Sequence, residues 1–464
     1  MWRLTFRAGT LEVFGPTLDD SAVDGGVIQI LVDKHILKWD VRADCFRAPA
    51  FRYFDVVKLL VRAKVVFDDD AKMYGDELKP KPFAKDPRDY QQKAIENWRS
   101  SSSRGVVVLP TGSGKTFVAC LAIADRSRDT LVVVPTIDLL HQWAAVLEEH
   151  FACDVGMVGG GSYEIAPLTI ITYDSAYLHM ENIGNRFGLV IFDEVHHLPS
   201  ASYALAARMC LAPFRLGLSA TLEREDGGEH VLDELIGEVA YREEINDLKG
   251  AYLADYDVVS LVVELDEELR EDWRVNREIY RRFVRSQGIR MSNPSGWTNF
   301  IIRSAGSEEG QQAMRAYRRQ KEIAQAAPQK IEVVEELLEK HANDQVLIFT
   351  ADNKTAYLLS RQQLLPIITH QTKAKERKRI LAYFGEGKYK AIVTSKVLNE
   401  GVDLPSASVA IIVSGSGTVR EHVQRLGRIL RLDGDKRATL YEIVSGDTGE
   451  TYTSERRRQH DAYR

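Results

Sequence analysis

Residues 106–116 read Val-Val-Val-Leu-Pro-Thr-Gly-Ser-Gly-Lys-Thr, so that an apolar run breaks into a glycine-rich turn. A β-branched strand, then such a turn and then a helix is the arrangement that a phosphate-binding loop requires. Its glycines let backbone N–H groups turn inward around an anion. A helix is expected over residues 117–124, with its positive N-terminus facing the phosphates. The residues expected to bind nucleotide in this loop are Pro110, Thr111, Gly112, Ser113, Gly114, Lys115 and Thr116.

The lysine and the threonine of this loop have separate expected roles. Lys115 can reach the β- and γ-phosphates, and the Thr116 hydroxyl can ligate Mg²⁺. The consensus opens with glycine where this chain has Leu109, so the match is strict only at the Gly-Lys-Thr end. We therefore predict that the chain binds a nucleoside triphosphate, with ATP and Mg²⁺ as its cofactors.

Length and composition describe an ordinary protein with several domains. With 464 residues the chain is long for one core, so two to four domains are expected. Apolar runs such as residues 131–134 and 410–413 are far too short to span a bilayer, and the first residues lack the features of a signal peptide. We expect no membrane partner. Four scattered cysteines without a Cys-x-x-Cys pair argue against a structural zinc or iron–sulfur site.

The hydrophobic pattern indicates an α/β fold with two parallel-sheet domains. Residues 1–83 alternate like short strands near positions 2–6, 11–13 and 27–32, followed by a helical stretch, so a small α+β domain is expected. Over residues 84–240, apolar strands alternate with helices, which is typical of a parallel sheet covered on both faces. The same pattern returns in residues 241–464, interrupted by a basic helical insert over about residues 256–327.

Charge is unevenly distributed along the chain. The net charge of −6 does not suggest a nucleic-acid partner, but residues 274–321 contain eleven basic and three acidic side chains. Such an excess on helices would follow a phosphodiester backbone with strong salt dependence, so we expect Arg281, Arg282 and Arg285 to contact nucleic acid. Trp297, in a break between helices, can either stack on a base or close a helical hairpin as a core residue.

A pair of carboxylates follows the apolar run of residues 189–192. Asp193 is suited to hold Mg²⁺ through its water shell, and Glu194 to orient and deprotonate the water that attacks the γ-phosphate. The alternative is a surface turn that caps the following helix. Because adjacent histidines cannot share one helix face, we expect His196 to couple through hydrogen bonds rather than bind a metal with His197.

A basic helix is expected near the C-terminus. Arg428 and Arg431 are three residues apart and point the same way, with Gln424 one turn earlier. Guanidinium groups that face a γ-phosphate act as arginine fingers, whereas the alternative is a solvated basic face. Since these arginines and the phosphate loop belong to different α/β domains, we predict that nucleotide binds between the two domains.

The order of these motifs resembles that of superfamily 2 helicases over about residues 84–445. By this resemblance, Arg88 and Gln91 belong to a segment that reads adenine, and Gly401 and Asp403 to a motif V that completes the nucleotide site. Ser219 and Thr221 look like motif III. Residues 134–136 and 347–350 look like motifs Ia and IV, which in that family hold the phosphates of a strand. The expected architecture is therefore two RecA-like domains.

Within that superfamily the chain resembles the XPB repair helicases, through its Asp-Glu-Val-His-His box and through Arg224, Glu225 and Asp226. The Arg-Glu-Asp element is associated there with strand separation, the basic insert looks like that family's thumb, and residues 1–83 stand where a damage-recognition module stands. The resemblance implies an ATP-dependent 3′→5′ helicase or duplex translocase of nucleotide excision repair. It implies duplex, forked or damaged DNA and a repair nuclease as partners of a monomeric, cytoplasmic prokaryotic protein, associated with the nucleoid when active.

Two other functions are compatible with parts of the pattern. An RNA-remodelling helicase is one, because Asp-Glu-x-His boxes occur in both classes of helicase. A nucleotide-gated scaffold that binds nucleic acid without turnover is the other. The scaffold is disfavoured, because an inactive ATPase would have lost at least one of the residues to which we assign the reaction: Lys115, Asp193, Glu194, Gln424, Arg428 and Arg431.

Overall fold

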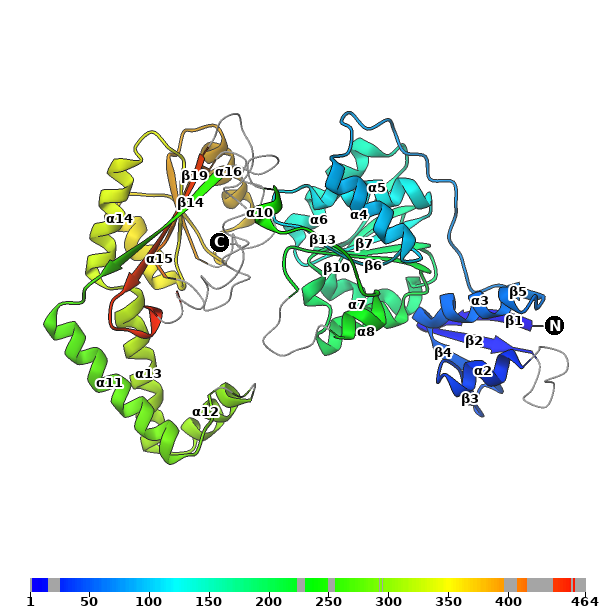
Figure 1. Ribbon diagram of the computed structural model, residues 1–464, viewed down its shortest axis with the longest axis horizontal. Coiled ribbons are helices and arrows are strands. Elements are labelled where there is room, and N and C mark those ends of the chain that lie inside the picture. The colour runs from blue at the N-terminus through cyan, green and yellow to red at the C-terminus, as the bar shows by residue number, and fades with distance from the viewer. Residues whose placement is uncertain are drawn as a thin grey trace. The chain divides into compact units, whose positions relative to one another are not determined.

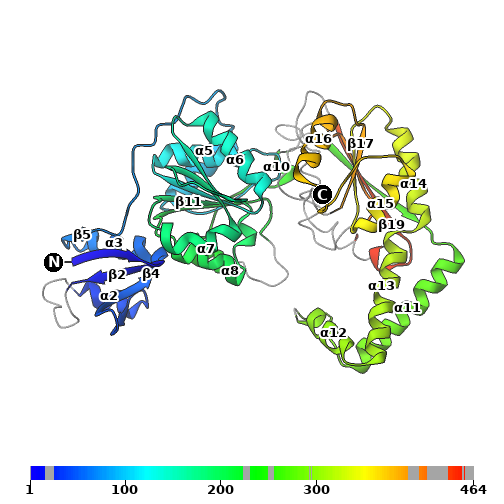
Figure 2. The same ribbon diagram turned by 180° about the vertical axis from the view of Figure 1, so that it is seen from behind.

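The computed structural model describes residues 2–15, 26–222, 230–248, 255–291, 293, 295–395, 407–414, 437–451 and 454. The chain divides into two compact units, one formed by Met1–Leu109 and Gly114–Glu243 and the other by Pro110–Ser113 and Glu244–Arg464 (Figures 1 and 2). Each unit contains one large sheet with helices on its faces, so the predicted α/β fold class is confirmed.

A small five-stranded sheet with two helices opens the first unit. Its strand order is β3-β4-β2-β1-β5, antiparallel except for β1 beside β5. Its elements are β1 (Trp2–Arg7), β2 (Thr10–Phe14), α2 (Val27–Asp33), β3 (Lys38–Asp40), β4 (Cys45–Pro49), the 3₁₀ turn η2 (Ala50–Arg52), α3 (Tyr53–Arg62) and β5 (Phe67–Asp69).

The alternating run at residues 27–32 was expected to be a strand, and this prediction is wrong. The segment is helix α2, which buries Val27, Ile28 and Leu31. Those positions are one and three residues apart, which fits one face of a helix better than one face of a strand. Gly26, at φ 76, begins the helix in a left-handed conformation that glycine adopts without strain.

The large sheet of the first unit has eight strands in the order β13-β6-β12-β11-β7-β10-β8-β9. All its neighbours pair in parallel except the edge hairpin of β8 and β9. Its strands are β6 (Arg104–Val108), β7 (Thr130–Val134), β8 (Val155–Gly159), β9 (Ser162–Tyr163), β10 (Leu168–Thr172), β11 (Leu189–Phe192), β12 (Phe214–Ser219) and β13 (Val239–Arg242). Its helices are α4 (Asp89–Ser100), α5 (Lys115–Arg126), α6 (Ile137–His150), α7 (Tyr173–Ile183), η3 (Val195–His197), α8 (Ala201–Met209) and α9 (His230–Leu235).

The small sheet domain packs directly against α8 and α9 of the larger one. Phe51 is part of the core of the large domain, and Leu211 is part of the core of the small one. At the edge of this contact, Arg52 and Arg208 both pair with Glu234, at 3.1 and 2.7 Å. Apolar burial therefore seats the two domains, and exposed ion pairs add little to it.

The sheet of the second unit has six parallel strands in the order β14-β19-β18-β15-β17-β16. Its strands are β14 (Asp255–Val263), β15 (Val346–Phe349), β16 (Ile367–Ile368), β17 (Ala391–Thr394), β18 (Val409–Ile412) and β19 (Arg437–Ser445). Besides the insert, its helices are α10 (Ile245–Leu248), α14 (Pro328–Lys340), α15 (Asn353–Gln362) and α16 (Ala374–Gly385).

Between β14 and α14 the chain forms an arm of three helices, α11 (Glu267–Ser286), α12 (Gly296–Ala305) and α13 (Glu308–Gln325), which projects from the second sheet (Figure 1). The insert was expected to begin at about residue 256, but residues 255–263 form β14 within the sheet. The reason is the run Val-Val-Ser-Leu-Val-Val at positions 258–263, which is rich in β-branched residues and pairs with β19 over its whole length.

Candidate active site

Three neighbouring parallel strands bring the predicted motifs to one edge of the first sheet. β12 lies between β6 and β11, and all three run in the same direction. The phosphate loop follows β6, the Asp-Glu pair follows β11, and β12 ends at Ser219. Because ligands of open α/β sheets bind beyond the carboxyl ends of the strands, this edge is the candidate active site.

The loop after β6 has the backbone of a phosphate cradle. Gly112 and Gly114 both have φ 85, and helix α5 begins directly after Gly114 without a side-chain cap. Ser113 is fully buried and donates its hydroxyl to the carbonyl of Pro110, 2.7 Å away. The Lys115 ammonium turns back to the Leu109 carbonyl at 3.3 Å. Hydrogen bonds within the loop thus fix its shape. The backbone N–H groups at the N-terminus of α5, which have no intrahelical partner, can bind an anion.

Gln91 of α4 lies against this loop. A Cβ at Gly114 would stand only 2.7 Å from Gln91 Nε2, so glycine is required there for close approach as well as for its φ. The Gln91 side chain is buried, and its Oε1 accepts from the backbone N–H of Arg88 at 3.0 Å. The oxygen of the amide therefore caps the N-terminus of α4. The assignment of Arg88 and Gln91 to adenine stays a prediction.

Asp193 is a buried carboxylate with defined partners. Its Oδ2 accepts from the indole Nε1 of Trp143 at 2.8 Å, and its Oδ1 from the backbone N–H of Glu194 at 3.0 Å. Burial raises the pKa of Asp193 to about 6, and the neighbouring Glu194 adds to the rise, while the Trp143 bond and the charge of Lys115 oppose it. A buried carboxyl pair beside one lysine is a site that a cation would stabilise.

Glu194 occupies a strained position. Its φ is 47, in the left-handed region that a residue with a side chain adopts at a cost of about 1–2 kcal/mol. Among the described residues its Oε2 is buried and accepts no hydrogen bond, although His196 Nδ1 lies 3.4 Å away. A carboxylate oxygen that accepts no hydrogen bond keeps the acceptor capacity that the role of general base requires.

His196 connects the Asp-Glu pair to the end of β12. It is fully buried, and its Nδ1 lies 3.0 Å from Ser219 Oγ. Ser219 Oγ in turn donates to the Thr221 carbonyl at 2.5 Å and accepts from the Thr221 N–H at 3.3 Å. His196, Ser219 and Thr221 therefore form one hydrogen-bonded chain, the geometry expected of a coupler.

The residues of this edge fit a nucleotide with its Mg²⁺. The hydroxyl of Thr111 is buried without a partner among the described residues, next to the two left-handed glycines. No cluster of three or more His, Cys, Asp and Glu side chains occurs in the described parts of the chain. Mg²⁺ does not need one, because it keeps several waters and takes oxygens from phosphate and from one or two side chains. The assignment of Thr116 and Asp193 as these ligands stays a prediction.

The remaining predicted site residues lie outside the described residues. They are Arg224, Glu225, Asp226, Gly401, Asp403, Gln424, Arg428 and Arg431. Their assignments, and that of a nucleotide site shared by two domains, stay predictions.

The cations expected to contact nucleic acid are on the arm. Arg281, Arg282 and Arg285 are exposed on α11 and have no ion pair with a described residue, so their assignment stays a prediction. Trp297 closes the helical hairpin without being a core residue, and its stacking on a base stays a prediction. It is 40% exposed, and its ring packs 4.9 Å from that of Tyr317 on α13, which closes the end of the arm.

Two important residues of the first unit were missed by sequence reasoning. Trp143 is one of them: a buried indole needs a hydrogen-bond acceptor, and its acceptor is Asp193. Arg215 is fully buried in β12, and its guanidinium donates to four backbone carbonyls, those of Ala207, Cys210, Ala212 and Leu235. Its position inside an apolar strand was the one available signal.

Three family models match the chain in sequence order. Residues 4–71 match the xeroderma pigmentosum group B helicase damage recognition domain, residues 84–224 the res subunit of type III restriction enzymes, and residues 310–461 the ERCC3/RAD25/XPB C-terminal helicase. No described helix is both long and apolar enough to cross a membrane.

Curated relatives cover most of the chain. It is 40% identical to the DNA 3′-5′ translocase XPB2 of Sulfurisphaera tokodaii, over 91% of this chain and 96% of that protein. It is 33% identical to the DNA 3′-5′ helicase XPB of Mycobacterium tuberculosis, over 78% of this chain and 61% of that protein.

Solved structures share the fold at low sequence identity. The Hef helicase domain of Pyrococcus furiosus gives a TM-score of 0.53 at 18% identity, covering 80% of this chain and 98% of that one. Dbp5 of Saccharomyces cerevisiae, bound to RNA and ADP BeF3, gives 0.56 at 15% identity, covering 82% of this chain and 89% of that one.

Proposed function

Since the chain belongs to the XPB family of helicases, we propose that it is an ATP-dependent 3′→5′ DNA translocase that opens DNA in nucleotide excision repair. The archaeal relative that it matches over nearly its whole length is named a DNA translocase, and the bacterial relative a DNA helicase. These names favour DNA over the RNA-remodelling alternative. The observation that supports turnover over a scaffold role is the buried Asp193 and Glu194 pair, joined through His196 to Ser219.

In the proposed reaction, each residue of the first-unit edge has a distinct task. Bound ATP with Mg²⁺ supplies the phosphoryl group and neutralises part of its charge. Lys115 and the amides of the phosphate loop bind the phosphates, and Asp193 and Thr116 hold the metal. Glu194 orients the attacking water and accepts its proton at the carboxylate. Trp143 fixes the rotamer of Asp193 by its hydrogen bond at 2.8 Å.

We assign the coupling of hydrolysis to DNA movement to the chain His196–Ser219–Thr221. Thr221 immediately precedes the segment that contains Arg224, Glu225 and Asp226, which we propose acts in strand separation. A change at Glu194 would reach that segment through two hydrogen bonds. Gln424, Arg428 and Arg431, with Gly401 and Asp403, would complete the nucleotide site from the second domain.

The small N-terminal domain is proposed to engage damaged or forked DNA. Residues 4–71 match a model that is named for damage recognition. A repair nuclease as protein partner, a monomeric state and a cytoplasmic location remain expectations from the family.

The experiment that tests this function compares ATPase stimulation by duplex DNA, forked DNA, single strands and RNA in a salt series. Stimulation by DNA and not by RNA is expected, with 3′→5′ displacement of a triplex-forming strand from duplex. Glu194→Gln is the matched control, because it keeps the side-chain size and removes the proton acceptor. It should abolish turnover and leave DNA and ATP binding intact. Stimulation by RNA alone would overturn the proposal. Normal turnover in Glu194→Gln would overturn the role assigned to that residue.

A further inference from the structure

A cavity of about 890 Å³ lies in the second unit, between the last helix of the arm and helix α15. One wall is the C-terminal part of α13, and the other is α15 with the loop that follows β15. That loop stands at the carboxyl edge of the second sheet, where ligands of open α/β sheets bind. The cavity is far from the phosphate loop in sequence, and no residue of the predicted nucleotide site lines it.

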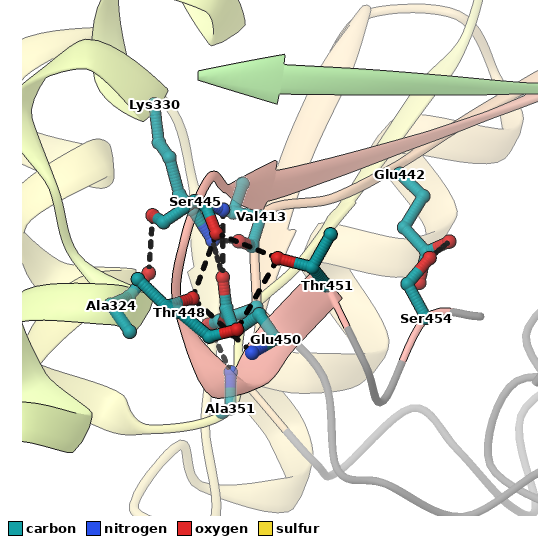
Figure 3. Close-up of polar contacts among 11 residues, drawn as sticks. Ala324, Lys330, Ala351, Val413, Glu442, Ser445, Thr448, Glu450, Thr451 and Ser454 are labelled. Carbon is teal, nitrogen blue, oxygen red and sulfur yellow. Dashed lines mark hydrogen bonds and ion pairs between the residues drawn. The ribbon is translucent and has the colours of Figure 1, made fainter. Parts of the chain in front are cut away.

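The two walls of this cavity, which we call the α13–α15 groove, are fixed to each other. Glu322 of α13 forms an ion pair with Lys354 of α15, and this contact lowers the pKa of Glu322. Behind the walls, Ser445 Oγ donates to the carbonyl of Ala324 at 2.8 Å, and the Ala351 N–H donates to Ser414 Oγ at 2.9 Å (Figure 3). The end of α13 and the loop after β15 are therefore each tied to a sheet strand or its end, so that the groove is formed before any ligand arrives.

A buried lysine stabilises the strand ends to which these walls are tied. Lys330, at the start of α14, is fully buried and donates to the Val413 carbonyl at 2.8 Å and to Glu450 Oε2 at 2.5 Å (Figure 3). Glu450 also accepts from the backbone N–H of Ser445 at 3.1 Å. A buried charge pair with its hydrogen bonds satisfied specifies one packing of the strand ends beneath the groove.

The groove presents cations that no described residue neutralises. Arg318 and Lys321 on α13 and Arg361 on α15 are exposed and have no ion pair within the described parts of the chain. The two acidic residues that line it are already engaged, Glu322 with Lys354 and Asp352 as the N-cap of α15. The groove is therefore complementary to a polyanion.

Aromatic rings accompany these cations. Tyr357 of α15 is 37% exposed, and Tyr317 of α13 is half-buried with its ring against Trp297. Cations on two walls with tyrosine rings between them are the combination used to bind single-stranded nucleic acid, where bases stack on the rings and phosphates meet the charges. A cavity of this size matches a small-ligand site, so it admits a short strand segment and not the width of a duplex.

We infer that this groove, defined by Arg318, Lys321, Tyr357 and Arg361, binds a segment of single-stranded nucleic acid. The inference rests on the proposed function, since strand separation by the motor would produce the single strand that this groove binds. It places the strand contacts of the arm at the root of α13, beside the second sheet, in addition to the α11 arginines expected from the sequence. An acidic protein segment is the competing occupant, and tyrosine stacking favours nucleic acid over it.

The test measures affinity of the full-length chain for a fluorescent oligothymidylate in a salt series. Arg318→Ala with Lys321→Ala should lower the slope of log affinity against log salt by about 1.4, since each lost phosphate contact on a single strand contributes about 0.7. The matched control is Lys388→Ala with Lys390→Ala, which removes the same charge just before β17, at the amino edge of the same sheet. The control should leave the slope unchanged.

A second pair of variants tests stacking independently of charge. Tyr357→Leu should weaken oligothymidylate binding by about tenfold, whereas Tyr357→Phe keeps the ring and should bind as the natural chain does. Unchanged affinity in Tyr357→Leu and an unchanged slope in the double variant would overturn the inference. Loss of poly-glutamate binding with intact strand binding would assign the groove to an acidic protein instead. Because these readouts need no ATP, they separate this inference from a failure of DNA-stimulated hydrolysis.

Discussion

His196 Nδ1 and Ser219 Oγ lie 3.0 Å apart in the core of the first unit, and this contact joins the ends of two neighbouring parallel strands. His196 follows the strand that leads to Asp193 and Glu194, and Ser219 ends the strand that leads to Thr221. Because both side chains are fully buried, the bond is not weakened by competition with water. Together with the 3.4 Å contact between Glu194 and His196, it connects Glu194 to Thr221, which precedes in sequence the element proposed to part the strands.

Removal of the Ser219 hydroxyl should uncouple the ATPase from DNA. In Ser219→Ala, basal hydrolysis should persist, because no residue that binds nucleotide is changed. Stimulation by DNA should fall by about tenfold, which corresponds to about 1.4 kcal/mol of coupling free energy. Steady-state ATPase with and without DNA measures both quantities.

Ser200→Ala is the control for this substitution. It also removes one serine hydroxyl, the cap of helix α8 that accepts from Tyr203 N, but it does not touch the His196 chain. Equal loss of stimulation in both variants would show that Ser219 acts through stability alone.

The raised pKa of Asp193 gives a pH-dependent stability. Because its folded pKa is about 6 against an ordinary 3.8, the native state binds more protons between these values. The nucleotide-free protein should therefore gain stability as the pH falls from above 6 toward 4. Asp193→Asn should remove this gain and stabilise the chain above that range by at most about 3 kcal/mol, while hydrolysis is lost.

Urea unfolding on either side of that pKa, without nucleotide or Mg²⁺, measures the effect. Exposed Asp68→Asn is the control and should leave the pH dependence as it is. If Asp193→Asn kept the pH dependence of the natural chain, another group would be responsible for it.

Gly114→Ala should impair nucleotide binding for two reasons. The residue has φ 85, and a Cβ there would lie 2.7 Å from Gln91 Nε2. The left-handed conformation alone costs about 1–2 kcal/mol for alanine, and the contact forces the loop or the glutamine to move. A titration with fluorescent nucleotide should show affinity reduced by more than tenfold.

Gly387→Ala is the control for a general effect of replacing a left-handed glycine outside the phosphate loop. Gly387 has φ 72, and a Cβ there would meet no atom within 4 Å, so only the conformational cost applies. Nucleotide affinity should be unaffected by it. A Gly114→Ala chain that bound nucleotide as tightly as Gly387→Ala would refute the close-approach argument.

Lys330→Met should destabilise the second unit by about 3–5 kcal/mol, because it leaves Glu450 without its buried cation. Adding Glu450→Gln should recover much of this loss, since the amide oxygen can still accept from the Ser445 N–H. Equilibrium urea unfolding measures both. If the double variant were as unstable as the single one, the Lys330 contacts other than the ion pair would dominate.

The strands of the two large sheets were predictable because strands buried on both faces consist of continuous apolar runs. Residues 189–192 were expected as a strand and are β11 without a shift, and the carboxylates after them follow from that placement. The run at residues 27–32 was misinterpreted, since two apolar pairs two residues apart, 28/30 and 30/32, suggested a strand where the structure has a helix that buries Val27, Ile28 and Leu31. A short segment can fit both the two-residue period of a strand and the 3.6-residue period of a helix. Packing against neighbouring elements then decides which of the two forms.

Contacts between distant residues were beyond the sequence. Nothing local relates Trp143 to Asp193, which are 50 positions apart, and the pairing follows from the order in which β7 and β11 enter the sheet. The α13–α15 groove is a further case, because its walls are separated by a helix and a strand. The charges on each wall were visible, but their meeting depends on the fold.

The six-residue strand β12 has Arg215 at one end, with its guanidinium 5.9 Å from the ring of Phe51 in the small domain, and Ser219 at the other. Four residues of extended chain, about 13 Å, separate these two anchors. One residue added or removed between them would turn Arg215 and Ser219 toward opposite faces of the sheet. The contact of the small domain with Arg215 and the contact of His196 with Ser219 thus depend on the same strand length. Insertions and deletions between Arg215 and Ser219 should therefore not be tolerated as sequences diverge.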